Sequence, residues 1–158
     1  MERTVVLNVV GLTSRLIGGD TPAIRDFVER HASARIEPVL PAVTCTAQAT
    51  YLTGKMPRDH GIVGNGWYDR EYDEHRFWKQ SNRLVRAPKL WEMLRAEDSE
   101  FTCAKLFWWY NMYSTADIAV TPRPLYPADG SKHFDIHTQP MGLRERLKKA
   151  LGPFPFRH

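Results

Sequence analysis

The chain alternates short apolar runs that favour β-strands with segments that favour helices, and this alternation constrains its fold more than any other feature. Residues 4–10, Thr-Val-Val-Leu-Asn-Val-Val, are β-branched and nearly all apolar, which is typical of a strand buried on both faces. Two further runs favour extended structure: 35–40 and 101–109. Four segments favour helices: one that begins at Pro22, then 44–53, 88–96 and 142–151. This order predicts an α/β fold with a mostly parallel sheet and right-handed crossovers.

The composition is that of an ordinary soluble domain. The 158 residues are 42% apolar and 25% charged, which is enough for one core and too little to expect two. The net charge of +4 comes from basic residues that are scattered along the sequence. Because no basic stripe forms, a nucleic-acid polymer is not expected as a partner.

The two cysteines and the N-terminal sequence bear on the compartment. Cys45 and Cys103 lack the paired spacing of a zinc knot or a disulfide framework, which favours a reducing environment. The chain does not begin with the long apolar core of a signal peptide, and no apolar run reaches membrane-spanning length. We therefore expect a cytoplasmic location and no membrane partner.

Thr44 stands where the extended run at 35–40 has ended at Pro41 and a helix is predicted to begin. In parallel sheets, ligands bind beyond the carboxyl ends of strands, and this turn would lie at that edge. The first turn of a helix offers unpaired N–H groups and the positive end of the dipole, which attract phosphate and favour an alkoxide. The local sequence is compatible with two roles for Thr44, a nucleophile or a simple N-cap.

A long loop is predicted over residues 56–72, where Gly, Pro, Asn and Asp are frequent. At most a short strand is expected around residues 62–63, and loops of this length inside a domain are usually functional. Asn65 lies in this loop between two glycines. By itself, that position is typical of a turn residue in the left-handed region.

A longer pattern connects these two segments. Pro41-Ala-Val-Thr44 is followed by Leu52-Thr-Gly54, Pro57, His60-Gly-Ile-Val63 and Asn65. With these anchors in this order, the chain resembles the nucleotide pyrophosphatase and phosphodiesterase branch of the alkaline phosphatase superfamily. The resemblance is clearest over residues 38–68 and extends more weakly from residue 4 to the end. The run at 108–113, with 121–124 and 127–130, resembles a bacterial subgroup of the same family.

The resemblance implies a fold, a chemistry and roles for two residues. The fold would be the N-terminal part of an alkaline-phosphatase-like three-layer sandwich. Thr44 matches the nucleophile, which forms a covalent intermediate while bound to one metal, and Asn65 matches the asparagine that donates to a phosphoryl oxygen. Two divalent metal ions, expected to be zinc, would hold the attacking and leaving oxygens. The substrate would be a small phosphodiester or a nucleotide.

The first predicted strand departs from the superfamily pattern. That strand ordinarily ends in a metal-binding aspartate followed by glycine, whereas this chain has Val10-Gly11. A shift of two residues places Asn8 there, whose side-chain carbonyl would be an uncharged metal ligand. Alternatively, Asn8 is a buried strand residue bonded to neighbouring backbone. Most of the other metal ligands are expected outside this chain.

Residues 1–158 are accordingly expected to be a truncated part of one catalytic domain, inactive without the remaining ligands. An unpaired sheet edge would then favour association with another chain. The alternative is a non-catalytic anion-binding or interaction module that keeps the phosphate site without the metals. A sulfatase-type site is disfavoured, because Cys45-Thr46-Ala47 lacks the Cys/Ser-x-Pro-x-Arg setting of that group.

Overall fold

A computed structural model describes residues 3–156, which divide into a unit up to Glu37 and a second unit from Pro38 on. In the first unit a short 3-10 helix, η1 (Ser14–Leu16), precedes the helix α1 (Pro22–Arg30). Thr21 holds the turn before α1, because its hydroxyl accepts from the Gly18 N–H and donates to the Leu16 carbonyl, both at 2.9 Å. The predicted helix start at Pro22 is confirmed.

The predicted strand at residues 4–10 is wrong. Between residues 3 and 37 no strand forms, and the apolar side chains of the run are exposed, with Leu7 at 80%. A strand is stabilised by ladder hydrogen bonds to a neighbouring strand, and this unit supplies none within its described residues. High β-propensity by itself is therefore not sufficient here.

The helices of the second unit lie close to the predicted segments. They are α2 (Thr44–Thr53), α3 (Pro57–His60), η2 (Asn82–Leu84), α4 (Leu90–Glu97) and α5 (Leu143–Leu151). As predicted, α2 stops at Gly54, which has the left-handed φ of 63° that a helix C-cap favours. At the start of α4 the Glu92 carboxylate accepts from the Lys89 N–H at 2.9 Å.

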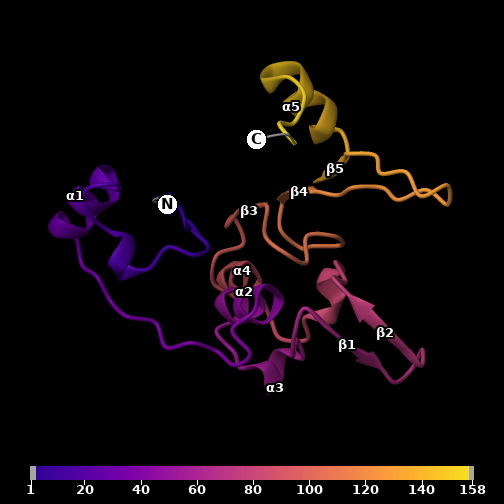
Figure 1. Ribbon diagram of the computed structural model, residues 1–158, viewed down its shortest axis with the longest axis horizontal. Helices are drawn as coiled ribbons and strands as arrows, with labels where there is room; N and C mark the ends of the chain where they lie inside the picture. The colour runs from indigo at the N-terminus through magenta and orange to yellow at the C-terminus, as the bar shows by residue number, and fades with distance from the viewer. Residues whose placement is uncertain (1–2, 157–158) are drawn as a thin grey trace. The chain divides into compact units, whose positions relative to one another are not determined.

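The second unit contains two small sheets, so the fold is mixed α/β (Figure 1). The first is an antiparallel hairpin of β1 (Gly66–Asp69) and β2 (Glu74–Phe77). The second has the order β3-β4-β5, with strands β3 (Ala104–Leu106), β4 (Ile118–Pro122) and β5 (Ile136–Gln139). Within it, β3 and β4 are parallel and Leu106 is in register with Val120. Strands β4 and β5 are antiparallel, and Val120 is in register with Thr138.

The prediction of a mostly parallel sheet is therefore wrong for the described residues. Only one of the three strand pairings is parallel. A parallel pairing needs a crossover, usually a helix, whereas residues 123–135 return directly from β4 to β5 through turns. The three-layer sandwich stays a prediction.

Two other strand predictions need correction. Residues 35–40 form no strand, and the predicted strand at 101–109 shrinks to the three residues of β3. In β3 the buried side chain is Lys105, whereas Leu106 is 50% exposed. The loop predicted at 56–72 contains two regular elements, α3 and β1. The short strand that was expected at most around residues 62–63 does not form.

The core of the second unit surrounds α2. A buried cluster joins Cys45 and Ala49 of this helix to Ile62, Val85 and Tyr110. Burying one large apolar side chain stabilises the folded state by roughly 1.5–3 kcal/mol. The cluster holds the start of α2 against the loop that follows α3. Among the described helices, none has the length and apolar content needed to cross a membrane.

Candidate active site at the start of helix α2

Thr44 is the first residue of α2, and the half-buried Thr44 side chain lies on the first helical turn. Val43 is the N-cap, with extended backbone angles (φ −118°, ψ 162°) and no side-chain cap hydrogen bond. The first intrahelical bond runs from the Ala47 N–H to the Val43 carbonyl at 2.9 Å. The N–H groups of residues 44–46 precede that bond and have no partner within the helix. The N-cap interpretation of Thr44 is therefore wrong.

Asn65 lies at this helix start. Its side-chain Oδ1 accepts a hydrogen bond from the Cys45 N–H at 2.9 Å, and its backbone carbonyl accepts from the Trp78 N–H at 2.8 Å. Because the oxygen faces the Cys45 amide, the NH₂ group of the side chain remains as a donor. The structure thus brings together Thr44 and Asn65, the two residues that the sequence predicted for one site.

His60 fixes the loop that carries Asn65. Its Nδ1 accepts from the Ile62 N–H at 3.1 Å, so Nε2 carries the proton and donates to the Thr50 hydroxyl at 3.0 Å. His60 is fully buried, and burial lowers the pKa of its imidazole, with the nearby Asp59 carboxylate opposing the change. The neutral ring therefore links α2 to the loop and has a structural role.

The sequence that carries this helix start, the asparagine and the His-Gly-Ile loop is similar to a known protein family. A family model described as "Type I phosphodiesterase / nucleotide pyrophosphatase" matches residues 4–157. The chain belongs to this family. The resemblance inferred from residues 41–65 is confirmed, and a hydrolase of the phosphodiesterase or nucleotide pyrophosphatase kind is supported. No curated protein and no solved structure matches the chain.

Two glycines of this phosphodiesterase family chain allow the loop its path. Gly61 has a φ of 81°, and a Cβ there would lie 3.3 Å from the Arg86 side chain. At Gly66, directly after Asn65, a Cβ would lie 2.4 Å from the Phe77 ring, closer than van der Waals contact allows. Side chains at these positions would displace the loop and Asn65 with it.

Sequence reasoning missed the aromatic residues near Asn65. Gln48 of α2 accepts from the Trp109 N–H at 2.7 Å, and the Trp109 ring packs edge-on against Trp78 with centroids 5.2 Å apart. The Trp109 indole N–H donates to the Lys79 carbonyl at 2.8 Å. Trp78 follows β2 directly and is 47% exposed. Gln48 and Trp109 are 61 positions apart, so no local pattern indicates their contact.

Cys45, the neighbour of Thr44, is not a competing nucleophile. Its side chain is 1% exposed and belongs to the core cluster. Burial raises the pKa of the thiol to about 11, so the thiolate that would react is scarce at neutral pH. Of these two adjacent residues, Cys45 is enclosed in the core and Thr44 is only half-buried.

Asn8, the third predicted site residue, is exposed and lies outside any strand. It belongs to the first unit and Thr44 to the second, so a shared metal site stays a prediction. Residues 3–156 contain no group of three or more His, Cys, Asp or Glu side chains that could hold a metal ion. These described residues do not by themselves fit a complete two-metal site, and we derive no step through a metal.

Proposed function

We propose that this chain binds the phosphoryl group of a small phosphodiester or nucleotide at the start of α2, with Thr44 as the nucleophile. The observation that carries the proposal is the hydrogen bond between Asn65 and the Cys45 amide, because it places an amide donor beside the first helical turn. The N–H groups of that turn that Asn65 does not use, together with the Asn65 NH₂ group, favour negative charge at one place. Small nucleotide substrates agree with the family to which the chain belongs.

The proposed reaction starts with attack of the Thr44 Oγ on phosphorus. A bond forms between Oγ and phosphorus, the bond from phosphorus to the leaving oxygen breaks, and the hydroxyl proton is released. Water then cleaves the threonyl ester, which restores the hydroxyl and releases the second product. Asn65 and the helix start stabilise the charge on the non-bridging oxygens during both displacements.

The exposed ring of Trp78 supports a nucleotide as the substrate. Its backbone N–H bonds to Asn65, and Trp109 packs against its ring, so the aromatic surface is held near the proposed phosphoryl site. Flat aromatic side chains stack with nucleobases, and each such contact stabilises binding by about 1–3 kcal/mol.

The proposal also includes divalent metal ions, for which residues 3–156 supply no complete site. The family generally uses divalent metal ions, which lower the pKa of a nucleophile and neutralise charge on phosphate. We keep two zinc ions, with Thr44 and Asn8 as ligands from this chain, as a prediction. It is tested separately, by zinc titration of the chain and of an Asn8→Ala variant.

The proposal is tested by trapping the intermediate. Because residues 1–158 are expected to be inactive without the remaining metal ligands, the assay uses a longer protein that contains these residues and supplies those ligands. This longer protein is incubated with bis(p-nitrophenyl) phosphate and divalent metal, and it is examined by peptide mass spectrometry. We expect an adduct on Thr44 and release of p-nitrophenol, both lost in Thr44→Val. Thr102→Ala, which removes an exposed threonine outside the site, is the matched control. An adduct on another residue, or unchanged hydrolysis by Thr44→Val, would contradict the proposal.

The same samples distinguish the non-catalytic alternative. An anion-binding module would bind inorganic phosphate at the start of α2 without forming the adduct. In that case amide resonances of residues 44–46 would shift on phosphate titration in both the parent chain and Thr44→Val. Binding without an adduct in the longer protein would favour this alternative over the enzyme.

A further inference from the structure

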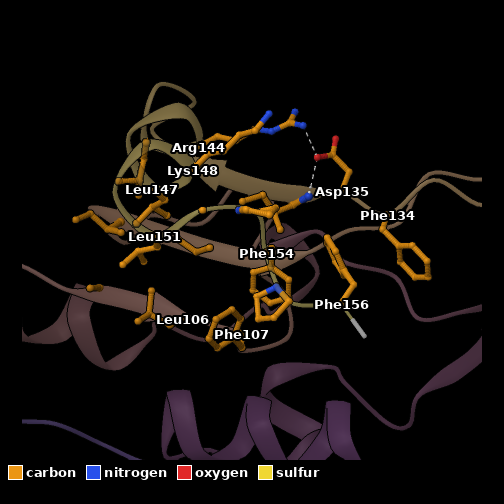
Figure 2. A pocket seen from close by; sticks show the side chains of 18 residues that line it. Leu106, Phe107, Phe134, Asp135, Arg144, Leu147, Lys148, Leu151, Phe154 and Phe156 are labelled. Atoms are coloured by element: carbon orange, nitrogen blue, oxygen red, sulfur yellow. Dashed lines mark hydrogen bonds and ion pairs between the residues drawn. The ribbon is translucent and has the colours of Figure 1, made fainter. Parts of the chain in front are cut away.

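Two places in the second unit are not explained by the proposed reaction. One is a cavity of about 920 Å³ between the sheet β3-β4-β5, the helix α5 and residues 152–156 (Figure 2). Its lining is partly exposed, with Leu151 at 80%, and within residues 3–156 nothing shows what covers it. The other is the link between Asn65 and Gly66, for which the structure defines hydrogen bonds of the side chain and of the main chain.

Asn65 is the only asparagine of the sequence that precedes a glycine. In an Asn-Gly pair the backbone nitrogen of the glycine can attack the side-chain amide carbon, because glycine has no Cβ to obstruct the approach. The other asparagines precede valine, arginine or methionine, whose side chains hinder this attack; they are Asn8, Asn82 and Asn111. Asn65 is half-buried, so water also reaches its side chain. The Asn65-Gly66 pair is therefore where the sequence favours deamidation.

The β1-β2 hairpin leaves the attacking nitrogen of Gly66 outside its ladder of hydrogen bonds. The Trp78 N–H donates to the Asn65 carbonyl at 2.8 Å, so Asn65 and Trp78 form a hydrogen-bonded pair of the antiparallel ladder. Bonded and non-bonded pairs alternate along such a ladder, and the next pair, Gly66 with Phe77, is therefore a non-bonded one. The Gly66 N–H thus points away from β2, and the hairpin does not hold it.

The start of α2 polarises the amide carbon that would be attacked. The Cys45 N–H donates to Oδ1 of Asn65 at 2.9 Å, and this donor would stabilise the negative charge that develops on Oδ1 during attack. The positive end of the α2 dipole acts in the same direction. Because Oδ1 makes this bond, the NH₂ group, which has to leave, lies on the other side of the amide.

We propose that Asn65 deamidates spontaneously and that this modification switches off the phosphoryl site. The Gly66 nitrogen loses its proton and bonds to Cγ of Asn65, the bond from Cγ to Nδ2 breaks, and Nδ2 takes up a proton and leaves as ammonia. Water then opens the succinimide, which gives aspartate or isoaspartate at position 65. An aspartate still accepts from the Cys45 N–H, but the NH₂ donor is lost and the new charge repels phosphate. The effect on phosphate rests on the proposed function, whereas the modification itself does not.

The test is incubation of the full chain at mildly alkaline pH, followed by peptide mass spectrometry with fragmentation that distinguishes aspartate from isoaspartate. A free peptide with the sequence of residues 61–69 provides the rate for an Asn-Gly pair outside the fold. We expect position 65 of the chain to convert at a rate within about tenfold of that of the peptide. The rate should rise with pH, because the Gly66 nitrogen has to lose its proton. The other three asparagines should stay intact and are the internal controls.

A pair of variants tests the attacking nitrogen. Gly66→Ala would obstruct it, but a Cβ at this position would lie 2.4 Å from the Phe77 ring. Gly66→Ala is therefore made together with Phe77→Ala, which removes an exposed side chain, and Phe77→Ala alone is the matched control. We expect the double variant to deamidate at least about tenfold more slowly than Phe77→Ala. Melting curves establish that both variants are folded.

Phosphate titration before and after conversion provides the second readout, with the amide resonances of residues 44–46 as the probe. We expect conversion to weaken phosphate binding at least about tenfold. The proposal is overturned if Asn65 is intact when the peptide has fully converted, if the two variants deamidate at equal rates, or if the converted chain binds phosphate as tightly as the parent chain. If Asn65 converts but the unmodified chain does not bind phosphate, the modification site stands, and the proposed function fails together with the switch.

Discussion

The side-chain oxygen of Asn65 accepts a hydrogen bond from the backbone amide of Cys45, 2.9 Å away and 20 residues earlier in the chain. This bond uses one of the free N–H groups of the first turn of α2 and fixes which face of the Asn65 amide remains available. It therefore connects the position of the loop to the position of Thr44. The fold and the proposed chemistry depend on the same contact.

Asn65→Asp separates these two roles. An aspartate keeps the acceptor for the Cys45 N–H and places negative charge at a helix start, which stabilises helices by about 0.3–1 kcal/mol. The NH₂ donor is lost, however, and the carboxylate repels phosphate. We expect unfolding by urea to be nearly unchanged or slightly harder, and inorganic phosphate to bind at least about tenfold more weakly.

Asn65→Ala is the control for this prediction. It removes both the acceptor and the donor, so it should lower the free energy of unfolding by about 1–3 kcal/mol in addition to weakening phosphate binding. If Asn65→Asp bound phosphate as tightly as the parent chain, the amide would not be a phosphoryl donor.

The buried His60 predicts a pH dependence of stability. Burial lowers the pKa of His60 below its ordinary value of 6.5, so below about pH 6.5 the unfolded chain binds the proton more readily than the folded chain. The contribution of the neutral His60 ring to the free energy of unfolding is therefore fully present above about pH 6.5. It is lost as the pH falls through the pKa that His60 has in the folded chain. His137, whose pKa is lowered by burial and by Arg123, changes stability in the same direction.

We expect the free energy of unfolding to fall between about pH 7 and pH 5, and His60→Gln to reduce that slope without abolishing it. The variant should also lose about 1–2 kcal/mol at pH 8, because the bonds to Thr50 and Ile62 are weakened. His75→Gln, at an exposed position, is the control. Urea titrations across this pH range provide the measurement, and an unchanged slope in His60→Gln would count against a neutral buried ring.

The sequence predicts helix α2, which carries Thr44, better than it predicts the strands. Helix α2 and its end at Gly54 follow from local properties, namely helix-favouring residues and a glycine that accepts a positive φ. The pairing of Thr44 with Asn65 is implied by the resemblance to a family whose motif lies within one short segment, and neither residue's local sequence indicates it. The helix and its C-cap are therefore visible without knowledge of the tertiary fold, whereas the pairing needs the comparison with a family.

Strands are harder to predict because their stability depends on a partner. Residues 4–10 have strong β-propensity, yet no strand forms in the first unit. In β3 a lysine occupies the buried position, since Lys105 donates to the Tyr110 carbonyl at 2.8 Å and lies over the Trp91 ring. Contacts of side chains with the backbone, whether near in sequence as here or 61 residues apart as for Gln48 with Trp109, leave no periodic signal.

Lys105 itself predicts a second pH dependence. Its side chain is 2% exposed, and burial lowers the pKa of its ammonium from 10.5 to about 7. Above about pH 7 the unfolded chain therefore holds the proton that the folded chain releases, and stability should rise with pH. The buried Cys45 acts oppositely above about pH 9, because its pKa is raised from 9.0 to about 11.

Between about pH 7 and pH 9 the effect of Lys105 is not opposed by that of Cys45. We expect the free energy of unfolding to increase with pH in this range. Lys105→Met removes the ionisable group, keeps a similar volume and should flatten this increase. Lys132→Met, at an exposed position outside any helix or strand, provides the matched substitution and should leave the increase intact. Guanidinium titrations at fixed ionic strength check both. A parent chain whose stability falls from pH 7 to pH 9 would contradict a low pKa for Lys105.

Gln48 connects the helix of the candidate site to the aromatic segment at Trp109, and its removal should affect both. Gln48→Met keeps the approximate size of the side chain but leaves the Trp109 N–H without its acceptor, which should lower the free energy of unfolding by about 1–3 kcal/mol. Tyr51→Met, at an exposed position on α2, should change it by less than about 0.5 kcal/mol. Because Trp109 packs against Trp78, Gln48→Met should also alter Trp fluorescence in the folded state, whereas Tyr51→Met should not. Equal stability of Gln48→Met and the parent chain would show that the Trp109 N–H finds another acceptor, and the link from α2 to the aromatic residues would then be unnecessary for the site.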